Sequence, residues 1–87
     1  MKTIVETSTG ISKYLFEDNE TLIVTADNIT VGNPVRFRIG DLNSNNTTIT
    51  ENVTNAPSDW YGCKYTFDGT TWAANSNWVD PREDDGE

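Results

Sequence analysis

The side chains that could perform chemistry in this sequence are carboxylates, some in neighbouring pairs, and a single thiol. Glu17-Asp18 and Asp84-Asp85 are such pairs. Glycoside hydrolysis needs two carboxylates on opposite sides of a cleft, whereas most acids here fall in segments whose composition predicts turns. The chain has no histidine, which removes the commonest general base and the usual partner of a serine or cysteine nucleophile. We therefore expect a protein that is not an enzyme.

Cys63 is the only cysteine, so the chain cannot form an intrachain disulfide. On one face of a strand, a lone cysteine is more often a small buried hydrophobe than a nucleophile. Without histidine, one cysteine cannot complete the usual zinc ligand sets. The acidic turn at 18–20 lacks the spacing of an EF-hand calcium loop. The sequence therefore predicts no metal site and no cofactor.

Six of the nine aromatic residues fall between positions 60 and 78. Within this span, Asp68-Gly69 predicts a two-residue hairpin turn. Such a turn would pair Phe67 with Thr70 and Tyr65 with Trp72. Tyr65, Phe67 and Trp72 would then share one face of the hairpin with Cys63, and we expect them to be core aromatic residues.

Three more aromatic residues, Trp60, Tyr61 and Trp78, lie outside the regular part of this hairpin. Tyrosine and tryptophan combine a large apolar area with a polar tip, which suits contact surfaces. We expect these three residues to bind a partner. The alternatives are that they complete a small core or form a face for a sugar.

The charge of the chain is strongly acidic, with a formal net charge of −8. The last eight residues, 80–87, hold five acids and one arginine and so contribute −4; we expect them to form a disordered acidic tail. The only close basic pair is Arg36 and Arg38, so the basic stripe of a nucleic-acid-binding protein is missing. On one strand these arginines would project from the same face, which is either solvated or paired with acids across strands, or is a docking patch for an acidic partner such as the tail of another subunit.

The composition favours strands, because threonine, asparagine and β-branched residues dominate and no segment shows an amphipathic helical period. We expect an all-β fold, a small antiparallel meander that forms a sandwich or barrel, with a single domain over 1–79. The cleanest alternation predicts that Val35, Phe37 and Ile39 face inward. No apolar run approaches the roughly 18 residues of a membrane span, and the N-terminus lacks the apolar region of a signal peptide. The strands expected before the hairpin are 3–7, 12–16, 21–25, 29–31, 35–39 and 47–53.

Two stretches of the chain resemble small proteins of tailed bacteriophages, particularly those of marine cyanophages. One stretch covers 13–18 and continues into 21–25, and the other covers 60–72 and continues into 78–81. The ending Tyr-x-Phe-Asp-Gly-x-x-Trp, followed by Trp-x-x-Pro, is similar to the ends of phage tail-fibre assembly and tail-associated proteins. The chain is shorter than tail-fibre assembly proteins and has no evident helical segment.

This resemblance implies a non-enzymatic virion protein, made in the host cytoplasm. It would be a tail- or fibre-associated assembly or attachment module, or a head decoration protein. Its partners would be phage structural proteins or further copies of itself, contacted through strand edges and the aromatic segment. We expect neither nucleic acid nor membrane as a partner. Two alternatives stay open: an acidic protein that inhibits a basic host protein by mimicking nucleic acid, and a small glycan-binding module.

Overall fold

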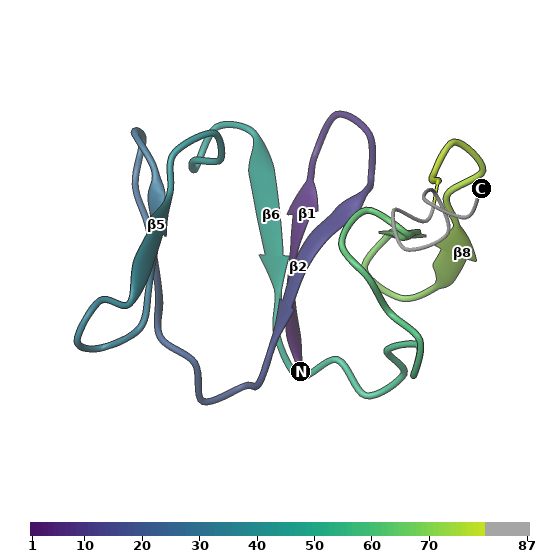
Figure 1. Ribbon diagram of the computed structural model, residues 1–87, viewed down its shortest axis with the longest axis horizontal. Helices are drawn as coiled ribbons and strands as arrows, with labels where there is room; N and C mark the ends of the chain where they lie inside the picture. Colours follow the sequence, from purple (N-terminus) through teal and green to yellow (C-terminus); the bar gives the residue numbers. More distant parts are fainter. Residues whose placement is uncertain (80–87) are drawn as a thin grey trace, which may run out of the picture.

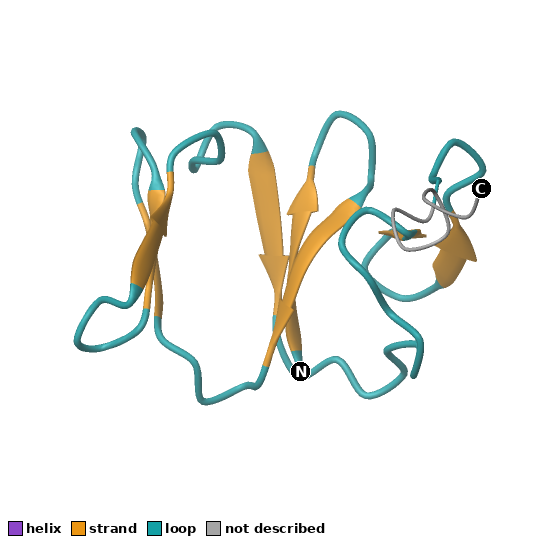
Figure 2. Cartoon of the chain, viewed as in Figure 1, coloured by secondary structure: helices purple, strands orange, loops and turns teal. Residues whose placement is uncertain are grey.

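The strands form three layers, and strand β1 (Lys2–Glu6) is the middle strand of the central layer (Figure 1). The computed structural model describes residues 1–79, so the tail predicted at 80–87 lies outside the described residues. Within the described residues, all regular secondary structure is β-strand (Figure 2), which confirms the predicted all-β class. The other strands are β2 (Ser12–Phe16), β3 (Leu22–Val24), β4 (Ile29–Val31), β5 (Phe37–Ile39), β6 (Thr47–Thr50), β7 (Tyr65–Phe67) and β8 (Trp72–Ala74).

The central layer is the sheet β2-β1-β6, in which β1 pairs antiparallel with both neighbours. β2 follows β1 through a turn at Gly10, whose φ of 74° suits glycine. β6 comes from much later in the chain and places Thr50 opposite Thr3. A bulge between Ile4 and Val5 shifts the β1–β2 register. The chain is therefore a meander only through β3, β4 and β5, because β6 returns to pair with β1.

One face of the central sheet packs against the sheet β3-β4-β5 and forms the larger core (Figure 1). Ile4 points to this face, and Ile29 and Val31 reach it from β4, the middle strand of the outer sheet. None of these three residues has exposed surface. The buried members of this core are Ile4, Ile29, Val31, Ile39 and Leu42, and Tyr14, Phe16, Leu22, Val24 and Ile49 pack against them.

The other face of the central sheet carries the hairpin β7-β8 and a smaller core. β7 meets the start of β2, where Ile11 bridges Thr66 and the Phe67 N–H donates to the Gly10 carbonyl at 2.9 Å. These contacts hold the hairpin over the central sheet. The buried members of this core are Val5, Val53 and Phe67, and Met1, Ala56 and Trp72 pack against them.

Polar groups on β1 are satisfied although the strand is covered on both faces and both edges. Thr3 has no exposed surface, and its hydroxyl contacts Ser12 Oγ at 2.6 Å and donates to the Tyr14 carbonyl at 2.8 Å. Lys2 is 7 % exposed, and its Nζ donates to the Glu20 carbonyl at 2.7 Å. Buried polar groups without partners would destabilise the fold, so these bonds allow β1 to occupy the middle layer.

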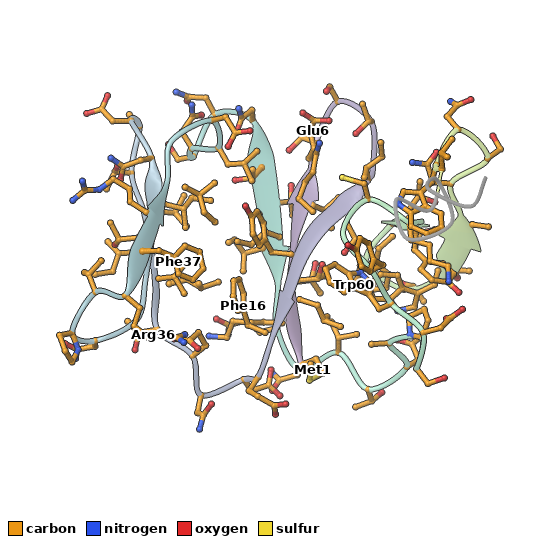
Figure 3. The ribbon with its side chains drawn as sticks, viewed as in Figure 1. Met1, Glu6, Phe16, Arg36, Phe37 and Trp60 are labelled. Carbon is orange, nitrogen blue, oxygen red and sulfur yellow. The ribbon has the colours of Figure 1, made fainter. Side chains whose placement is uncertain are left out.

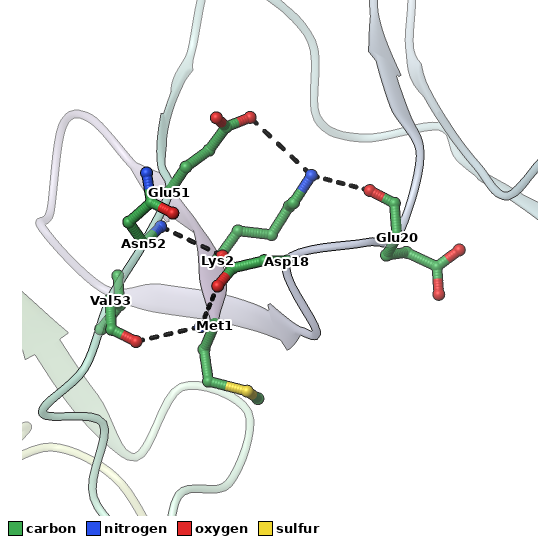
Figure 4. A network of polar contacts seen from close by, with 7 residues as sticks. All are labelled: Met1, Lys2, Asp18, Glu20, Glu51, Asn52 and Val53. Atoms are coloured by element: carbon green, nitrogen blue, oxygen red, sulfur yellow. Dashed lines mark hydrogen bonds and ion pairs between the residues drawn. The ribbon is translucent and has the colours of Figure 1, made fainter.

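The N-terminal end of β1 is tied to two distant segments (Figure 4). The Met1 amino group donates to Asp18 Oδ2 at 2.9 Å and to the Val53 carbonyl at 3.0 Å. Asp18 Oδ1 accepts a hydrogen bond from the Asn52 N–H at 3.1 Å. The Met1 amine first, and then Asn52, hold the pKa of Asp18 below its ordinary value. One carboxylate thus joins the β2–β3 loop to β1 and to the segment after β6.

The hairpin forms in a different register from the predicted one. Phe67 lies opposite Trp72 rather than Thr70. The predicted two-residue turn is wrong because Asp68 Oδ1 accepts hydrogen bonds from the N–H groups of Thr70 (2.9 Å) and Thr71 (2.7 Å), which stabilise a longer loop. The register differs by two residues, and an even shift keeps every side chain on its face. The three hairpin aromatic residues therefore still share a face.

Cys63 does not join that face. It precedes β7 in a left-handed backbone conformation with φ of 69°, so the alternation predicted from the hairpin does not extend to it. Its N–H donates to the Ser12 carbonyl at 3.0 Å, and its carbonyl accepts from Asn75 Nδ2 at 2.8 Å. The side chain is half-buried. Cys63 is therefore part of a backbone junction between β2 and the hairpin.

The strand predicted over 35–39 is shorter than expected, because the turn after β4 includes Val35. The inward position predicted for Val35 is wrong, since the residue lies in that turn and is 53 % exposed. Ile39 is buried in the larger core. Phe37 faces the core side and its ring lies 6.4 Å from that of Phe16, yet it is 41 % exposed because β5 is an edge strand (Figure 3).

Candidate functional site

Partly exposed aromatic rings gather with a lysine beside the hairpin. The rings of Tyr61 and Trp78 lie 5.8 Å apart, centroid to centroid, at an interplanar angle of 56°. Lys64 Nζ lies 5.4 Å from the centroid of the Trp78 ring, within the range of a cation–π interaction. Tyr61 is 36 % exposed and Trp78 is half-buried. We call Tyr61, Lys64 and Trp78 the aromatic surface.

Asp59 fixes the position of the lysine in the aromatic surface. Its Oδ2 lies 2.9 Å from Lys64 Nζ, and its Oδ1 accepts a hydrogen bond from the Tyr65 hydroxyl at 2.6 Å. The Tyr65 hydroxyl first, and then Lys64, lower the pKa of Asp59, and the same hydrogen bond raises the pKa of Tyr65. At neutral pH the aromatic surface therefore has an ammonium group and a carboxylate beside its two rings.

Backbone hydrogen bonds bring the two halves of the aromatic surface together from opposite ends of the hairpin. The Lys64 N–H donates to the Tyr61 carbonyl at 2.9 Å, and the Trp78 N–H donates to the Asn75 carbonyl at 3.0 Å. The Asn75 N–H donates to the Lys64 carbonyl at 2.9 Å and so connects the two turns. The rings are positioned by the fold before any partner is present.

Trp60 is directed into the molecule, unlike its neighbour Tyr61. Its indole N–H donates to Ser12 Oγ at 3.0 Å, and Ser12 has no exposed surface. Figure 3 shows Trp60 on the hairpin side of the central sheet. The partner contact predicted for Trp60 stays a prediction, and we leave Trp60 out of the aromatic surface because its polar tip is committed to Ser12.

The hairpin aromatic residues form a second group, which meets the aromatic surface through the hydrogen bond from Tyr65 to Asp59. Phe67 is 4 % exposed and its ring stacks on that of Trp72 with centroids 4.3 Å apart. The Tyr65 ring meets Trp72 edge-on at 6.3 Å, and both residues are half-buried. The Trp72 indole N–H donates to Asn55 Oδ1 at 3.2 Å. The aromatic segment therefore divides into inner rings that pack on the molecule and outer rings at its surface.

The predicted basic pair lies away from the aromatic surface, at the outer sheet (Figure 3). Arg36 precedes β5 and forms an ion pair with Glu20. Arg38 lies in β5, opposite Thr30 of β4, and is exposed. The prediction that both arginines project from one face of a strand is wrong, because only Arg38 is in the strand. The two arginines do not join the rings in one site.

Sequence reasoning missed Asp59 and Lys64 as members of the candidate site. Their positions next to Trp60 and Tyr65 offer a signal, since a lysine close to aromatic rings can form a cation–π interaction and a nearby carboxylate can pair with it. The contact between Tyr61 and Trp78 has no such local signal, because the whole hairpin separates them in the sequence.

Comparison of the chain with protein-family models, with curated proteins and with solved structures gave no match. Within residues 1–79, no group of three or more histidine, cysteine or acidic side chains is placed to hold a metal ion. The same part of the chain contains no helix long and apolar enough to cross a membrane. Together the aromatic surface and the adjoining Asp59 offer ring area, one ammonium group and one carboxylate, a combination suited to packing and charge contacts.

Proposed function

We propose that this chain is a non-enzymatic structural or assembly protein of a tailed-bacteriophage virion, associated with the tail or a fibre or decorating the head, and that it acts by protein–protein docking. The aromatic surface carries the docking part of the proposal. Tyrosine and tryptophan are enriched at the centres of protein interfaces, where they contribute most of the binding energy. The resemblance of 13–25 and 60–81 to phage tail-associated proteins supports the virion part.

The aromatic surface suits this role because it is held in place before binding. Asp59 restrains Lys64, and Asn75 joins the turns that carry Tyr61 and Trp78. A surface that is already ordered loses less conformational entropy on association. The partner would be a phage structural protein or a second copy of the chain. Repetition on a symmetric particle strengthens many weak contacts through multivalency.

The virion assignment is tested by mass spectrometry of purified particles of the source phage, with copies of this chain counted against the major capsid protein. We expect on the order of tens to hundreds of copies, because sites on a symmetric particle repeat. The copy number would also separate a tail position from a head position. Absence from particles, together with abundance in infected cells, would contradict the assignment.

The docking surface is tested in particles assembled with the double variant Tyr61→Ala, Trp78→Ala. We expect the copy number per particle to fall by about tenfold or more, since loss of interface aromatic residues commonly costs more than tenfold in affinity. The melting temperature should change little, because neither residue belongs to either core. Ile23→Ala is the matched control, since Ile23 is 51 % exposed on the outer sheet. An unchanged copy number for the double variant, or an equal loss of stability and incorporation, would assign these rings to packing.

A glycan is the second candidate partner for the aromatic surface, because ring faces beside the Asp59 carboxylate provide both stacking and hydrogen-bonding groups. Sugar binding would change the fluorescence of Trp78. A broad glycan panel that leaves the tryptophan fluorescence unchanged would exclude a glycan partner.

The net charge of −8 favours a third candidate, an acidic inhibitor of a basic host protein. Such a complex should dissociate steeply between low and moderate salt, whereas a packed structural contact should not.

A further inference from the structure

β6 is the open edge of the central sheet. β1 pairs with one side of β6, and no strand within residues 1–79 pairs with the other side. The opposite edge strand, β2, is met at its start by β7, where Ile11 bridges Thr66. Edge strands are commonly protected by charges or proline, and β6 has neither between Thr47 and Thr50. An uncharged edge of this kind can accept another strand.

The pairing with β1 shows which backbone groups of β6 face the open edge. The Thr7 N–H donates to the Asn46 carbonyl at 2.9 Å. Because hydrogen-bonded pairs alternate in an antiparallel ladder, Thr48 and Thr50 direct their backbone groups to β1. The N–H and carbonyl of Ile49 therefore point away from β1. An incoming strand would form its central backbone bonds with Ile49.

A groove lies beside this edge, between β6 and the tip of the hairpin. It consists of two adjoining hollows of about 220 and 320 Å³ that share Thr50, Phe67 and Gly69. Thr48 and Thr50 form the β6 wall, and Gly69 and Thr70 form the hairpin wall. Alternate side chains of a strand added to β6 would point to this side of the sheet.

The charged residues that line the groove are both acidic. They are Asp68, at the hairpin tip, and Glu51, directly after β6; none of the described lysines or arginines lines the groove. The N–H groups of Thr71 and Thr70 keep the pKa of Asp68 below its ordinary value, so the carboxylate is charged at neutral pH. Lys2 Nζ approaches Glu51 only to 3.8 Å, and the Glu51 side chain is 63 % exposed. Such a groove disfavours acidic occupants, including a second copy of a chain with net charge −8.

We propose that this groove accepts an extended basic peptide segment of a partner protein, which adds as a strand to β6 and pairs its lysine or arginine side chains with Glu51 and Asp68. Backbone bonds to Ile49 set the register of the added strand. Its alternate side chains enter the groove between β6 and the hairpin tip. The site is separate from the aromatic surface, so either surface can fail its test while the other passes.

The probe is a library of displayed peptides of about twelve residues, long enough to span β6, selected against the full chain. We expect the enriched peptides to carry lysine or arginine around a β-branched stretch. Their affinity should fall by about tenfold or more between low and moderate salt, because the charges that pair are exposed.

Two substitutions at one exposed groove position provide a matched pair. Thr48→Lys places a positive charge in the groove and should weaken binding of the enriched peptides by about tenfold or more. Thr48→Glu introduces a side chain of similar size with the opposite charge and should preserve or strengthen binding. Ile49→Pro removes the Ile49 N–H, which faces the open edge. Proline is tolerated at such positions of edge strands, so the variant should fold but should no longer bind the enriched peptides. Melting curves identify a variant that fails to fold, and the Thr48 pair then decides alone.

Several results would overturn the proposal. The first is a selection that yields no enriched peptide or yields acidic peptides. The second is equal binding of the enriched peptides to Thr48→Lys and Thr48→Glu. The third is self-association of the wild-type chain in analytical ultracentrifugation that Thr48→Lys disrupts, which would assign the edge to a second copy.

Discussion

On one face of the central sheet, aliphatic side chains from β1, β4 and β5 are buried against each other. On the other face, a smaller set of buried side chains is joined by hydrogen bonds of defined direction in holding the layers together. The first core has five buried hydrophobic residues and the second has three. Rings stack on both sides, Tyr14 on Phe16 at the first and Phe67 on Trp72 at the second, but the second side adds the indole hydrogen bonds from Trp60 to Ser12 and from Trp72 to Asn55. Apolar burial is non-directional, whereas hydrogen bonds fix orientation. Both proposed binding surfaces lie on the directional side.

The sharpest test of this contrast is Ile4→Ala in the first core. Ile4 has no exposed surface, so we expect a loss of about 4 kcal/mol in the free energy of unfolding, from lost burial and the cavity left behind. That is a large fraction of the stability of a small domain. Urea unfolding measures the loss. A loss below about 1 kcal/mol would mean that the first core is loosely packed.

Phe67→Ala is the corresponding change in the second core. We expect a loss of about 3 kcal/mol, concentrated in the hairpin because the outer sheet packs in the first core and contributes no residue to the second. Hydrogen exchange should accelerate in β7 and β8 and leave β3, β4 and β5 protected. Uniform acceleration across all strands would show that the two cores unfold as one unit and that the contrast between them has no energetic counterpart.

Trp60→Phe tests the directional contacts alone. The variant keeps a ring but loses the indole N–H, while Ser12 Oγ keeps its contact with the Thr3 hydroxyl. Since no buried group is left without a partner, we expect a loss of only about 1 kcal/mol in urea unfolding. Trp72→Phe, at the more exposed Asn55 contact, is the control and should cost less. The reverse order would place the anchor of the hairpin at Asn55.

The smallest expected effect is a loss of stability in acid. Asp18, Asp59 and Asp68 have pKa values lowered from 3.8 in the folded chain. Their stabilisation is therefore complete above the ordinary pKa and is lost as the pH falls through the lower folded values. Melting temperatures should decline as the pH falls below about 4, and Asp59→Asn should reduce that decline. A melting temperature that is constant from about pH 5 to pH 2.5 would contradict these pKa shifts.

Much of the strand pattern could be predicted from local sequence, because alternation and turn residues are local signals. The spans 12–16 and 29–31 match β2 and β4. The hairpin register could not be predicted from Asp68-Gly69 alone, because the Asp68 carboxylate caps a longer loop instead of occupying the tight turn. Asp side chains favour such local bonds, so the two turns compete for the same residue.

The three-layer arrangement had no local signal. β1 is buried at Lys2, Thr3, Ile4 and Val5 in succession, so it lacks the alternation of apolar and polar residues that would show which face points inward. The inward position of Trp60 depends on Ser12, far away in the sequence. Of the candidate site, only the gathering of aromatic residues could be predicted from the sequence. Which rings lie inside and which lie at the surface is decided by long-range contacts.

The pairing of β1 with β6 has a consequence for synthesis on the ribosome. β1 gains its second neighbouring strand only when Thr50 can pair with Thr3. The central sheet therefore closes only after β6 has left the exit tunnel. Until then the nascent chain presents β1 as an unprotected edge, a template for pairing with other chains. Nascent chains whose β6 is still inside the exit tunnel should therefore aggregate or recruit chaperones, whereas chains tethered through a linker long enough to place Val53 outside the tunnel should have a closed central sheet.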